Sequence, residues 1–114
     1  MIERTNTILY CRNWNQTVRF YRDVLDLVVH FETDWFVEFH LTAIAYLSIA
    51  DAACATIPSG GGDGVTLSFR VTDIESEYRR LISFGITPGP METKWGSRTF
   101  FFRDPEGHRI ELWS

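Results

Sequence analysis

The sequence offers few side chains for chemistry, and Glu111 is the first of them. It could accept a hydrogen bond from a ligand amine or amide, or it could pair with Arg109 or Arg98, since an unpaired buried carboxylate is costly. Arg109 has the same strand parity as Glu111, and its guanidinium could bind a ligand carboxylate. These residues indicate polar recognition of a small ligand, with a structural ion pair as the alternative.

The three histidines differ in what they could do. His40 alternates with Phe36 and Glu38, so these side chains should share one strand face, and His40 could act as an acid, a base or a ligand donor. A lone histidine at a strand end is nevertheless more often merely exposed. We expect His30 to be a surface strand residue and His108 to belong to a turn, facing away from the ligand.

Nucleophilic catalysis finds little support in the sequence. Cys11 is expected on a helix-packed face, and Ser48 and Ser68 have no evident histidine partner. The three glycines at 60–62 lack the Lys and Ser/Thr of a phosphate-binding loop, and they precede a strand, whereas such a loop precedes a helix. No cysteine and histidine spacing suggests zinc, so both cysteines are expected to be thiols.

A strand and helix pattern must position these side chains. Residues 5–12 alternate as a strand, and residues 13–26 carry an apolar stripe at helical spacing, with Asn13 as N-cap and Gln16 completing a capping box. Strand candidates follow at 27–32, 35–41 and 44–50, the last two joined by a short hairpin connection. The first half is therefore predicted to be βαβββ.

The pattern restarts after a glycine-rich segment. A strand at 65–71 leads to a helix capped by Asp73 and ended near Gly85, and strands follow at 98–103 and 108–113, with a weak one near 86–87 or 91–93. We predict an α+β fold in a single domain over 1–114: module 1 at about 5–50, a linker at 51–64 and module 2 at about 65–114. Two curved mixed sheets would enclose a cleft.

Composition argues against several classes of protein. The chain of 114 residues is 45% apolar and 23% charged, as in an ordinary globular domain, and has no apolar run near the ~20 residues of a membrane span. A net charge of −4 without a Lys/Arg cluster argues against nucleic-acid binding. The first residues have no secretory pattern, so we expect a cytoplasmic protein.

Three segments carry a resemblance to a known family: NWNQTVRFYRDVLDL at 13–27, RVTDIESEYRRL at 70–81 and WGSRTFFFRDPEGHRIELW at 95–113. In this order and separation they resemble the vicinal oxygen chelate superfamily, which includes glyoxalase I, extradiol dioxygenases, fosfomycin-resistance enzymes and bleomycin-binding proteins. The resemblance implies the glyoxalase/bleomycin resistance/dioxygenase fold. It implies less about activity, because isomerases, lyases, dioxygenases and non-catalytic binders share this scaffold.

The resemblance also implies where a metal would be bound. Metal-dependent members place ligands on the first and last strands of each module, and these positions fall on Asn6, Tyr46, Thr66 and Glu111. Only Glu111 is a common ligand for a transition metal, and imidazole donors are absent from the set. We therefore predict no metal and no other cofactor.

Aromatic residues fall where the family has its cleft and the mouth of that cleft. Flat aromatic walls suit a ring-bearing ligand, although core packing would explain each ring singly. Arg70 has the parity of Thr66 and Ser68 and should point the same way as Glu111. The predicted ligand-binding residues are Trp35, Phe36, Glu38, His40, Tyr46, Arg70, Trp95, Arg98, Phe101, Arg109, Glu111 and Trp113.

The sequence therefore favours a metal-independent protein of the bleomycin-resistance type, which would act as a homodimer and sequester an aromatic or amphipathic compound. The alternative is an isomerase, lyase or cyclase-type enzyme that uses Glu111, His40 or a tyrosine as acid or base, with or without an unusual metal site. A third hypothesis is a structural subunit that binds no ligand.

Overall fold

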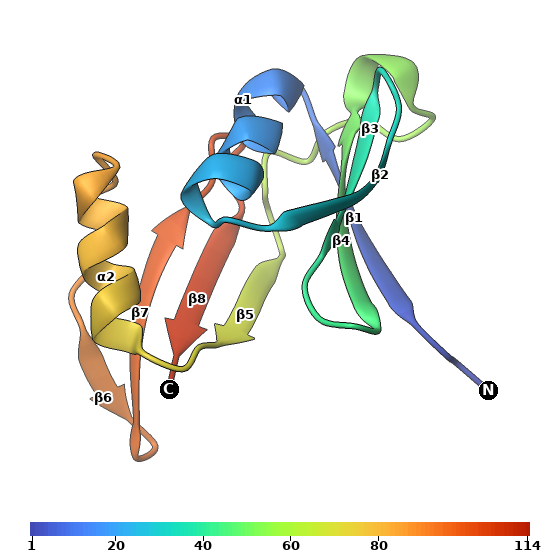
Figure 1. Ribbon diagram of the computed structural model, residues 1–114. Helices are drawn as coiled ribbons and strands as arrows, with labels where there is room; N and C mark the ends of the chain where they lie inside the picture. The colour runs from blue at the N-terminus through green and yellow to red at the C-terminus, as the bar shows by residue number, and fades with distance from the viewer. The chain divides into compact units, whose positions relative to one another are not determined.

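The computed structural model describes residues 1–114 and divides them into two compact units. Unit 1 comprises Met1–Gly61, and unit 2 comprises Gly62–Ser114. Each unit contains one four-stranded mixed sheet with its helices (Figure 1). The predicted α+β class and the repeat of two modules are confirmed.

Unit 1 has the strand order β1-β4-β3-β2. Its strands are β1 (Thr5–Cys11), β2 (Val28–Glu32), β3 (Phe36–His40) and β4 (Ala45–Asp51), followed by a short 3-10 turn, η2 (Ala52–Cys54). Strand β1 runs parallel to β4, with Asn6 beside Tyr46 and Ile8 beside Ser48. Strand β3 runs antiparallel to β4, with Glu38 opposite Ser48.

The helix of unit 1 differs from its prediction. It begins as α1 (Trp14–Arg19) and continues as a π-helical segment, η1 (Phe20–Val24). The predicted capping box is wrong, because the Asn13 side chain makes no capping hydrogen bond. Instead the Thr17 hydroxyl donates to the backbone carbonyl of Asn13 over 2.8 Å. The apolar stripe is as expected, and Tyr21 is fully buried against Phe39 of β3.

Unit 2 has the strand order β5-β8-β7-β6. Its strands are β5 (Thr66–Arg70), β6 (Glu92–Lys94), β7 (Ser97–Arg103) and β8 (Arg109–Trp113). Helix α2 (Ile74–Ser83) is capped by the carboxylate of Asp73, which accepts from the Ser76 amide over 3.1 Å. Gly85 follows with a φ of +81°, as the sequence predicted for the helix end.

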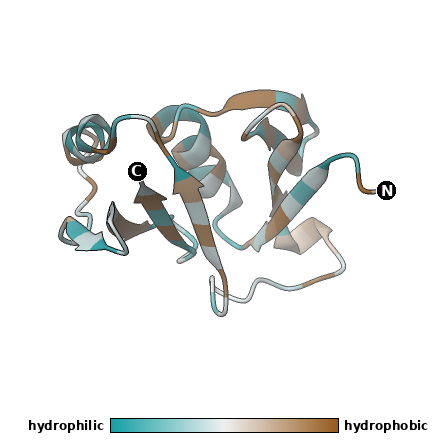
Figure 2. Cartoon of the chain, turned by 90° about the horizontal axis from the view of Figure 1, so that it is seen from below, coloured by the Kyte–Doolittle hydropathy of each residue, from teal (hydrophilic) through white to brown (hydrophobic).

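Each sheet has one apolar and one polar face, because side chains alternate along its strands. In unit 1 the apolar face includes Val37, Phe39, Leu47 and Ile49, all 2% exposed or less. In unit 2 Phe100 lies on the corresponding face, and Tyr78 of α2 packs on it edge to face at 4.9 Å. Figure 2 shows the resulting bands of hydrophobic and hydrophilic residues along the strands.

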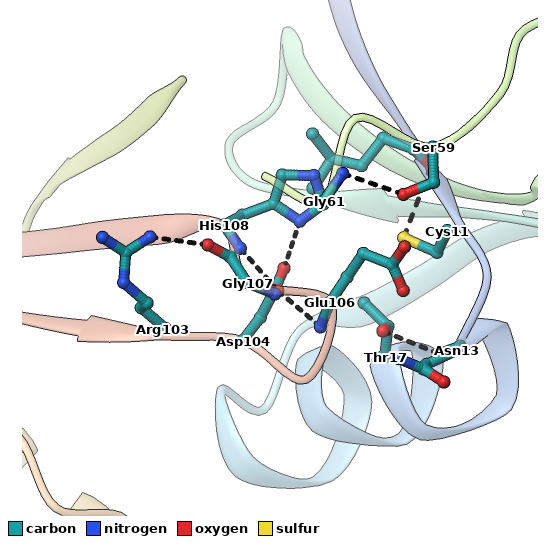
Figure 3. Close-up of polar contacts among 11 residues, drawn as sticks. Cys11, Asn13, Thr17, Ser59, Gly61, Arg103, Asp104, Glu106, Gly107 and His108 are labelled. Atoms are coloured by element: carbon teal, nitrogen blue, oxygen red, sulfur yellow. Dashed lines mark hydrogen bonds and ion pairs between the residues drawn. The ribbon is translucent and has the colours of Figure 1, made fainter. Parts of the chain in front are cut away.

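A buried carboxylate organises the turn between β7 and β8. Asp104 Oδ1 accepts from the backbone amides of Glu106, Gly107 and His108 over 3.0, 2.9 and 2.9 Å. Asp104 Oδ2 lies 2.8 Å from His108 Nδ1 (Figure 3). His108 therefore belongs to the turn, as predicted. Gly62 fits against this turn with a φ of +86°, where a Cβ would meet the Gly107 backbone at 2.4 Å.

The helices of the chain are too short or too polar to cross a membrane. Cys11 is buried, Cys54 is exposed, and neither cysteine is in a disulfide.

Candidate functional site

The polar face of the unit 1 sheet is organised around Glu38. Its carboxylate accepts from Arg4 Nη2 and from Asn6 Nδ2, each over 3.1 Å, and His30 Nδ1 lies 2.7 Å from Oε1. Glu38 is only 8% exposed, and its three polar partners offset the cost of that burial. The hydrogen bond from His30 lowers the pKa of Glu38 most, burial opposes this effect, and Arg4 lowers the pKa further.

Asn6 extends this network to the last strand of the unit. Its side-chain oxygen accepts from the Ser48 hydroxyl over 2.7 Å, so both ends of the amide are bonded within the sheet. We call Arg4, Asn6, His30, Glu38 and Ser48 the Glu38 cluster.

The rings of His40 and Tyr46 lie beside His30 of the Glu38 cluster. The ring centroids of His30 and His40 are 4.7 Å apart, and Tyr46 lies 5.0 Å from His30 and 4.8 Å from His40. The Arg4 guanidinium lies 3.8 Å from the centroid of the Tyr46 ring, within the range of a cation–π contact. Arg4 thus binds both a carboxylate and an aromatic face of the sheet.

The polar face of the unit 2 sheet carries Glu111, with different partners. Ser68 Oγ donates to Oε1 over 2.6 Å, and Thr99 Oγ1 donates to Oε2 over 2.8 Å. No basic nitrogen of the chain lies within 4.0 Å of this carboxylate. The hydrogen bond from Ser68 lowers the pKa of Glu111 most, burial opposes it, and Thr99 with the more distant charges of Arg109 and Lys94 lowers it further. Glu111 is therefore a carboxylate whose charge no direct partner neutralises.

A hollow of about 350 Å³ lies over Glu111. It is lined by Ser68, Lys94, Trp95, Ser97, Thr99, Glu111 and Trp113. The Arg70 guanidinium lies 5.4 Å from the centroid of the Trp113 ring. Trp95 is fully exposed in the β6–β7 turn and has a φ of +54°, a costly conformation for a bulky residue. Such strain is concentrated at functional sites in proteins.

Arg109 lies on the same face as Glu111. Its Nε donates to the Thr66 hydroxyl over 2.9 Å, and its guanidinium lies 4.6 Å from the centroid of the Phe101 ring. The parity argument from the sequence therefore oriented Arg109 correctly.

The strand registers test which residues of the two units correspond. Asn6 and Thr66 occupy matching places on the first strands, ahead of the helix that follows each of them. Asn6 lies beside Tyr46, and Thr66 lies beside Arg109. The counterpart of Tyr46 is therefore Arg109.

Ser48, two residues beyond Tyr46, is the counterpart of Glu111. This corrects the correspondence of Tyr46 with Glu111 expected from the sequence. Ser48 lies opposite Glu38 of β3, and Glu111 lies opposite Phe101 of β7. The carboxylate thus belongs to the third strand in unit 1 and to the last strand in unit 2.

The side chains at the positions where metal-dependent relatives bind their metal do not suit a catalytic transition metal. The Asn6 amide is occupied at both ends, and the Thr66 hydroxyl accepts from the cationic Arg109. No group of three or more His, Cys, Asp and Glu side chains in the chain is placed to hold a metal ion. A hydroxyl and an amide are weak donors for such metals.

Most of the predicted ligand-binding residues lie on the two polar faces. In unit 1 these are Phe36, Glu38, His40 and Tyr46, with Trp35 next to Phe36; in unit 2 they are Arg70, Phe101, Arg109, Glu111 and Trp113, with Trp95 in the adjoining turn. Arg98 is the exception, and its placement with Glu111 was wrong. It shares parity with the buried Phe100 and forms an ion pair with Glu75 of α2.

His30 was underestimated from the sequence. It is partly exposed, as expected, but it is also the closest side-chain partner of Glu38. Val28 pairs with His40, so alternation along β2 places His30 on the same polar face as His40 and Glu38. This parity was not applied to His30 in the sequence, which is why the contact with Glu38 was missed.

The comparisons with known proteins agree with this architecture. The model of the Glyoxalase/Bleomycin resistance protein/Dioxygenase superfamily matches residues 4–112. No curated protein matches the chain.

Several solved structures resemble the chain. Lactoylglutathione lyase from Agrobacterium tumefaciens is 24% identical, with a TM-score of 0.77 over 96% of this chain and 90% of that one. The oxidase ChaP-H2 is 22% identical, with a TM-score of 0.77 over 100% of this chain and 94% of that one. TnmS3, an antibiotic-binding protein from a Streptomyces species, is 21% identical, with a TM-score of 0.79 over 98% and 94%. At these identities the likeness concerns the fold alone.

Proposed function

Because the chain belongs to the glyoxalase/bleomycin resistance protein/dioxygenase superfamily, we propose that it binds a small ring-bearing molecule on the polar face of unit 2, without a metal. One observation carries the proposal: an ionised Glu111 with no ion-pair partner lies in a hollow lined by two tryptophans. An aromatic or amphipathic compound would offer a ring to the tryptophans and a polar group to the carboxylate of Glu111.

The size and lining of the hollow support a small-molecule ligand. Its volume of about 350 Å³ lies at the lower end of the range of ligand pockets, roughly 300–1,000 Å³. Stacking on an aromatic side chain contributes roughly 0.5–1.5 kcal/mol beyond burial. Trp113 and Trp95 therefore offer two surfaces against which a planar ring would pack.

Glu111 supplies the polar part of the recognition. Each of its oxygens already accepts one hydroxyl hydrogen bond, and each has capacity for another donor. A ligand amine, amide or hydroxyl would take that place, and a cationic amine would gain most because no basic side chain competes for the charge.

The proposal assigns the protein to the binding members of its superfamily. TnmS3, which shares the fold, is an antibiotic-binding protein, so sequestration of an antibiotic is compatible with this scaffold. The homodimer and the cytoplasmic location expected from the sequence remain part of the proposal. Light scattering that gives the monomer mass at high protein concentration would contradict the dimer.

A titration of ring-bearing amines and antibiotics tests the proposed site. Tryptophan fluorescence and calorimetry are measured for the wild type, Trp113→Ala, Trp95→Ala and Glu111→Gln. We expect saturable quenching in the wild type and roughly tenfold weaker binding in Trp113→Ala. Glu111→Gln should weaken amine-bearing ligands but not their neutral analogues, and Glu77→Gln serves as the control of equal charge change. The proposal fails if no compound saturates the wild type, or if neither tryptophan variant affects the best binder.

A second function, acid–base catalysis, is favoured by the contact between His30 and Glu38. A carboxylate 2.7 Å from His30 Nδ1 fixes the ring and leaves Nε2 to exchange a proton with a substrate. The test is deuterium exchange from D₂O into enolisable carbonyl compounds, followed by NMR. Catalysed exchange that disappears in His30→Asn supports this function, and exchange no faster than in buffer argues against it.

A further inference from the structure

Two arginines face each other across the central strands of unit 2. Arg103 of β7 pairs directly with Arg109 of β8, so both side chains leave the sheet on the Glu111 face. Like charges in directly opposed positions of neighbouring strands destabilise a sheet. This pair therefore raises the question of what compensates its charge.

The protein itself supplies only neutral partners for these two side chains. Arg103 Nη1 donates to the carbonyl of Gly107 over 2.7 Å (Figure 3). Arg109 Nε donates to the Thr66 hydroxyl over 2.9 Å. Neither guanidinium has an acidic side chain within 4.0 Å. Since each guanidinium has five N–H donors, most of them remain to bind a ligand.

Two hollows adjoin the arginine pair, and their linings differ in charge. The larger, of about 560 Å³, is lined by Gly85, Ile86, Thr87, Phe101, Phe102, Arg103 and Arg109 and has no acidic residue. The smaller, of about 380 Å³, is lined by residues 62–66 with the same two arginines and includes the carboxylate of Asp63. An anion is therefore favoured in the larger hollow.

We propose that Arg103 and Arg109 form a binding site for a small aromatic anion, whose carboxylate or phosphate group is held by both guanidiniums. Guanidinium groups bind both kinds of oxyanion through paired, charge-assisted hydrogen bonds. Phe101 and Ile86 provide apolar surface for the ring in the same hollow. This hollow and the hollow over Glu111 have no lining residue in common, and neither Trp95 nor Trp113 lines it. The proposed anion site therefore does not depend on the function proposed above.

The experiment compares four probes with the folded full chain at constant ionic strength. Benzoate, phenyl phosphate and inorganic phosphate carry the anion, and benzamide is the neutral analogue of benzoate. Binding is followed by backbone amide NMR shifts in the wild type, Arg103→Gln, Arg109→Gln and Arg109→Lys. Arg79→Gln, which removes an exposed arginine of α2, is the matched control.

We expect saturable shifts at residues 85–87 and 101–103 with benzoate or phenyl phosphate, and at least roughly tenfold weaker binding in either glutamine variant. Arg109→Lys keeps the charge and should lose less affinity than Arg109→Gln, which separates recognition from misfolding. A response to phosphate without a ring identifies the phosphoryl group as the recognised anion, and a response to benzoate alone identifies the carboxylate.

Four results would overturn the proposal. Equal binding of benzamide would make the hollow an apolar site, and an equal loss in Arg79→Gln would reduce the effect to the overall charge. Absence of saturation by all three anions would show that the arginine pair binds no such ligand. Trp113→Ala should not change the affinity for benzoate; if it does, the anion binds in the tryptophan hollow instead.

Discussion

The two sheets share a strand order, yet they treat their central carboxylate differently. Glu38 on β3 is held by Arg4 and His30, two groups that can carry positive charge. Glu111 on β8 is held by Ser68 and Thr99, which are neutral. The same scaffold thus contains one carboxylate with charged partners and one with neutral hydrogen-bond donors only, which is the one we propose as a ligand contact. The partners, more than the position in the fold, decide which role is open to each.

The turns that join the last two strands differ as well. In unit 2 the turn depends on the buried Asp104, which accepts three backbone amides. In unit 1 the exposed Thr42 hydroxyl accepts from the amides of Ile44 and Ala45 over 3.4 and 3.2 Å. A buried charge therefore fixes one turn, and an exposed hydroxyl fixes the other.

The largest expected effect comes from removing these two turn anchors. Asp104→Ala leaves three amides and His108 without their partner in a buried place and should lower the free energy of unfolding by about 3–5 kcal/mol. Thr42→Ala should cost about 0.5 kcal/mol, because water replaces the exposed hydroxyl. Urea denaturation of both variants provides the measurement. Equal losses would show that the two turns do not differ as described.

Exchanging each central carboxylate for an amide sharpens the comparison further. Glu38→Gln should lower the free energy of unfolding by about 1–2 kcal/mol, because Arg4 and His30 lose a charged acceptor. Glu111→Gln should cost less, since Ser68 and Thr99 can still donate to the amide oxygen. Thermal and urea unfolding at neutral pH measure both changes. A greater loss in Glu111→Gln would contradict the assignment of Glu38 as the structural carboxylate.

The stability difference between wild type and Glu38→Gln should also depend on pH. The folded-state pKa of Glu38 is lowered, so its ionised form contributes stability above the unfolded-state pKa of about 4.3 and loses it as the pH falls through the lower folded value. The difference between the two proteins should therefore be flat near neutral pH and shrink below about pH 4. A difference that grows on acidification would contradict the sign of the pKa shift.

The smallest expected effect concerns one hydroxyl. Ser68→Ala removes the hydrogen bond that lowers the pKa of Glu111 most, so this pKa should rise toward its ordinary value. Carbon-detected NMR titration of the carboxyl group measures the change. Ser48→Ala, which removes a hydroxyl from the polar face of unit 1, should leave the Glu111 titration unchanged.

Alternation along the strands was the strongest guide from sequence to site. It placed Arg109 with Glu111, and applied to Arg98 it would have assigned that residue to the helix side with Phe100. Applied to β2, where Val28 pairs with His40, it would also have assigned His30 to the polar face that carries Glu38.

Two other expectations needed information that the sequence does not carry. Asn13 and Asp73 look alike as helix caps, but only Asp73 has the extended backbone that suits a cap, with φ −129° and ψ 92°. The correspondence of Ser48 with Glu111 depends on strand register, and register is set by pairing over long sequence separations.

The strand orders also bear on synthesis of the chain at the ribosome. In each unit the first strand is an edge strand whose sole neighbour is the last strand of that unit (Figure 1). Strand β1 therefore cannot pair until β4 has been synthesised. At a synthesis rate of roughly 5–20 residues per second, β1 stays unpaired for a few seconds. An unpaired edge strand invites association with other nascent chains. The polar run Thr5-Asn6-Thr7 at the start of β1 lowers the apolar content of this strand, and with it the tendency to associate before β4 is made.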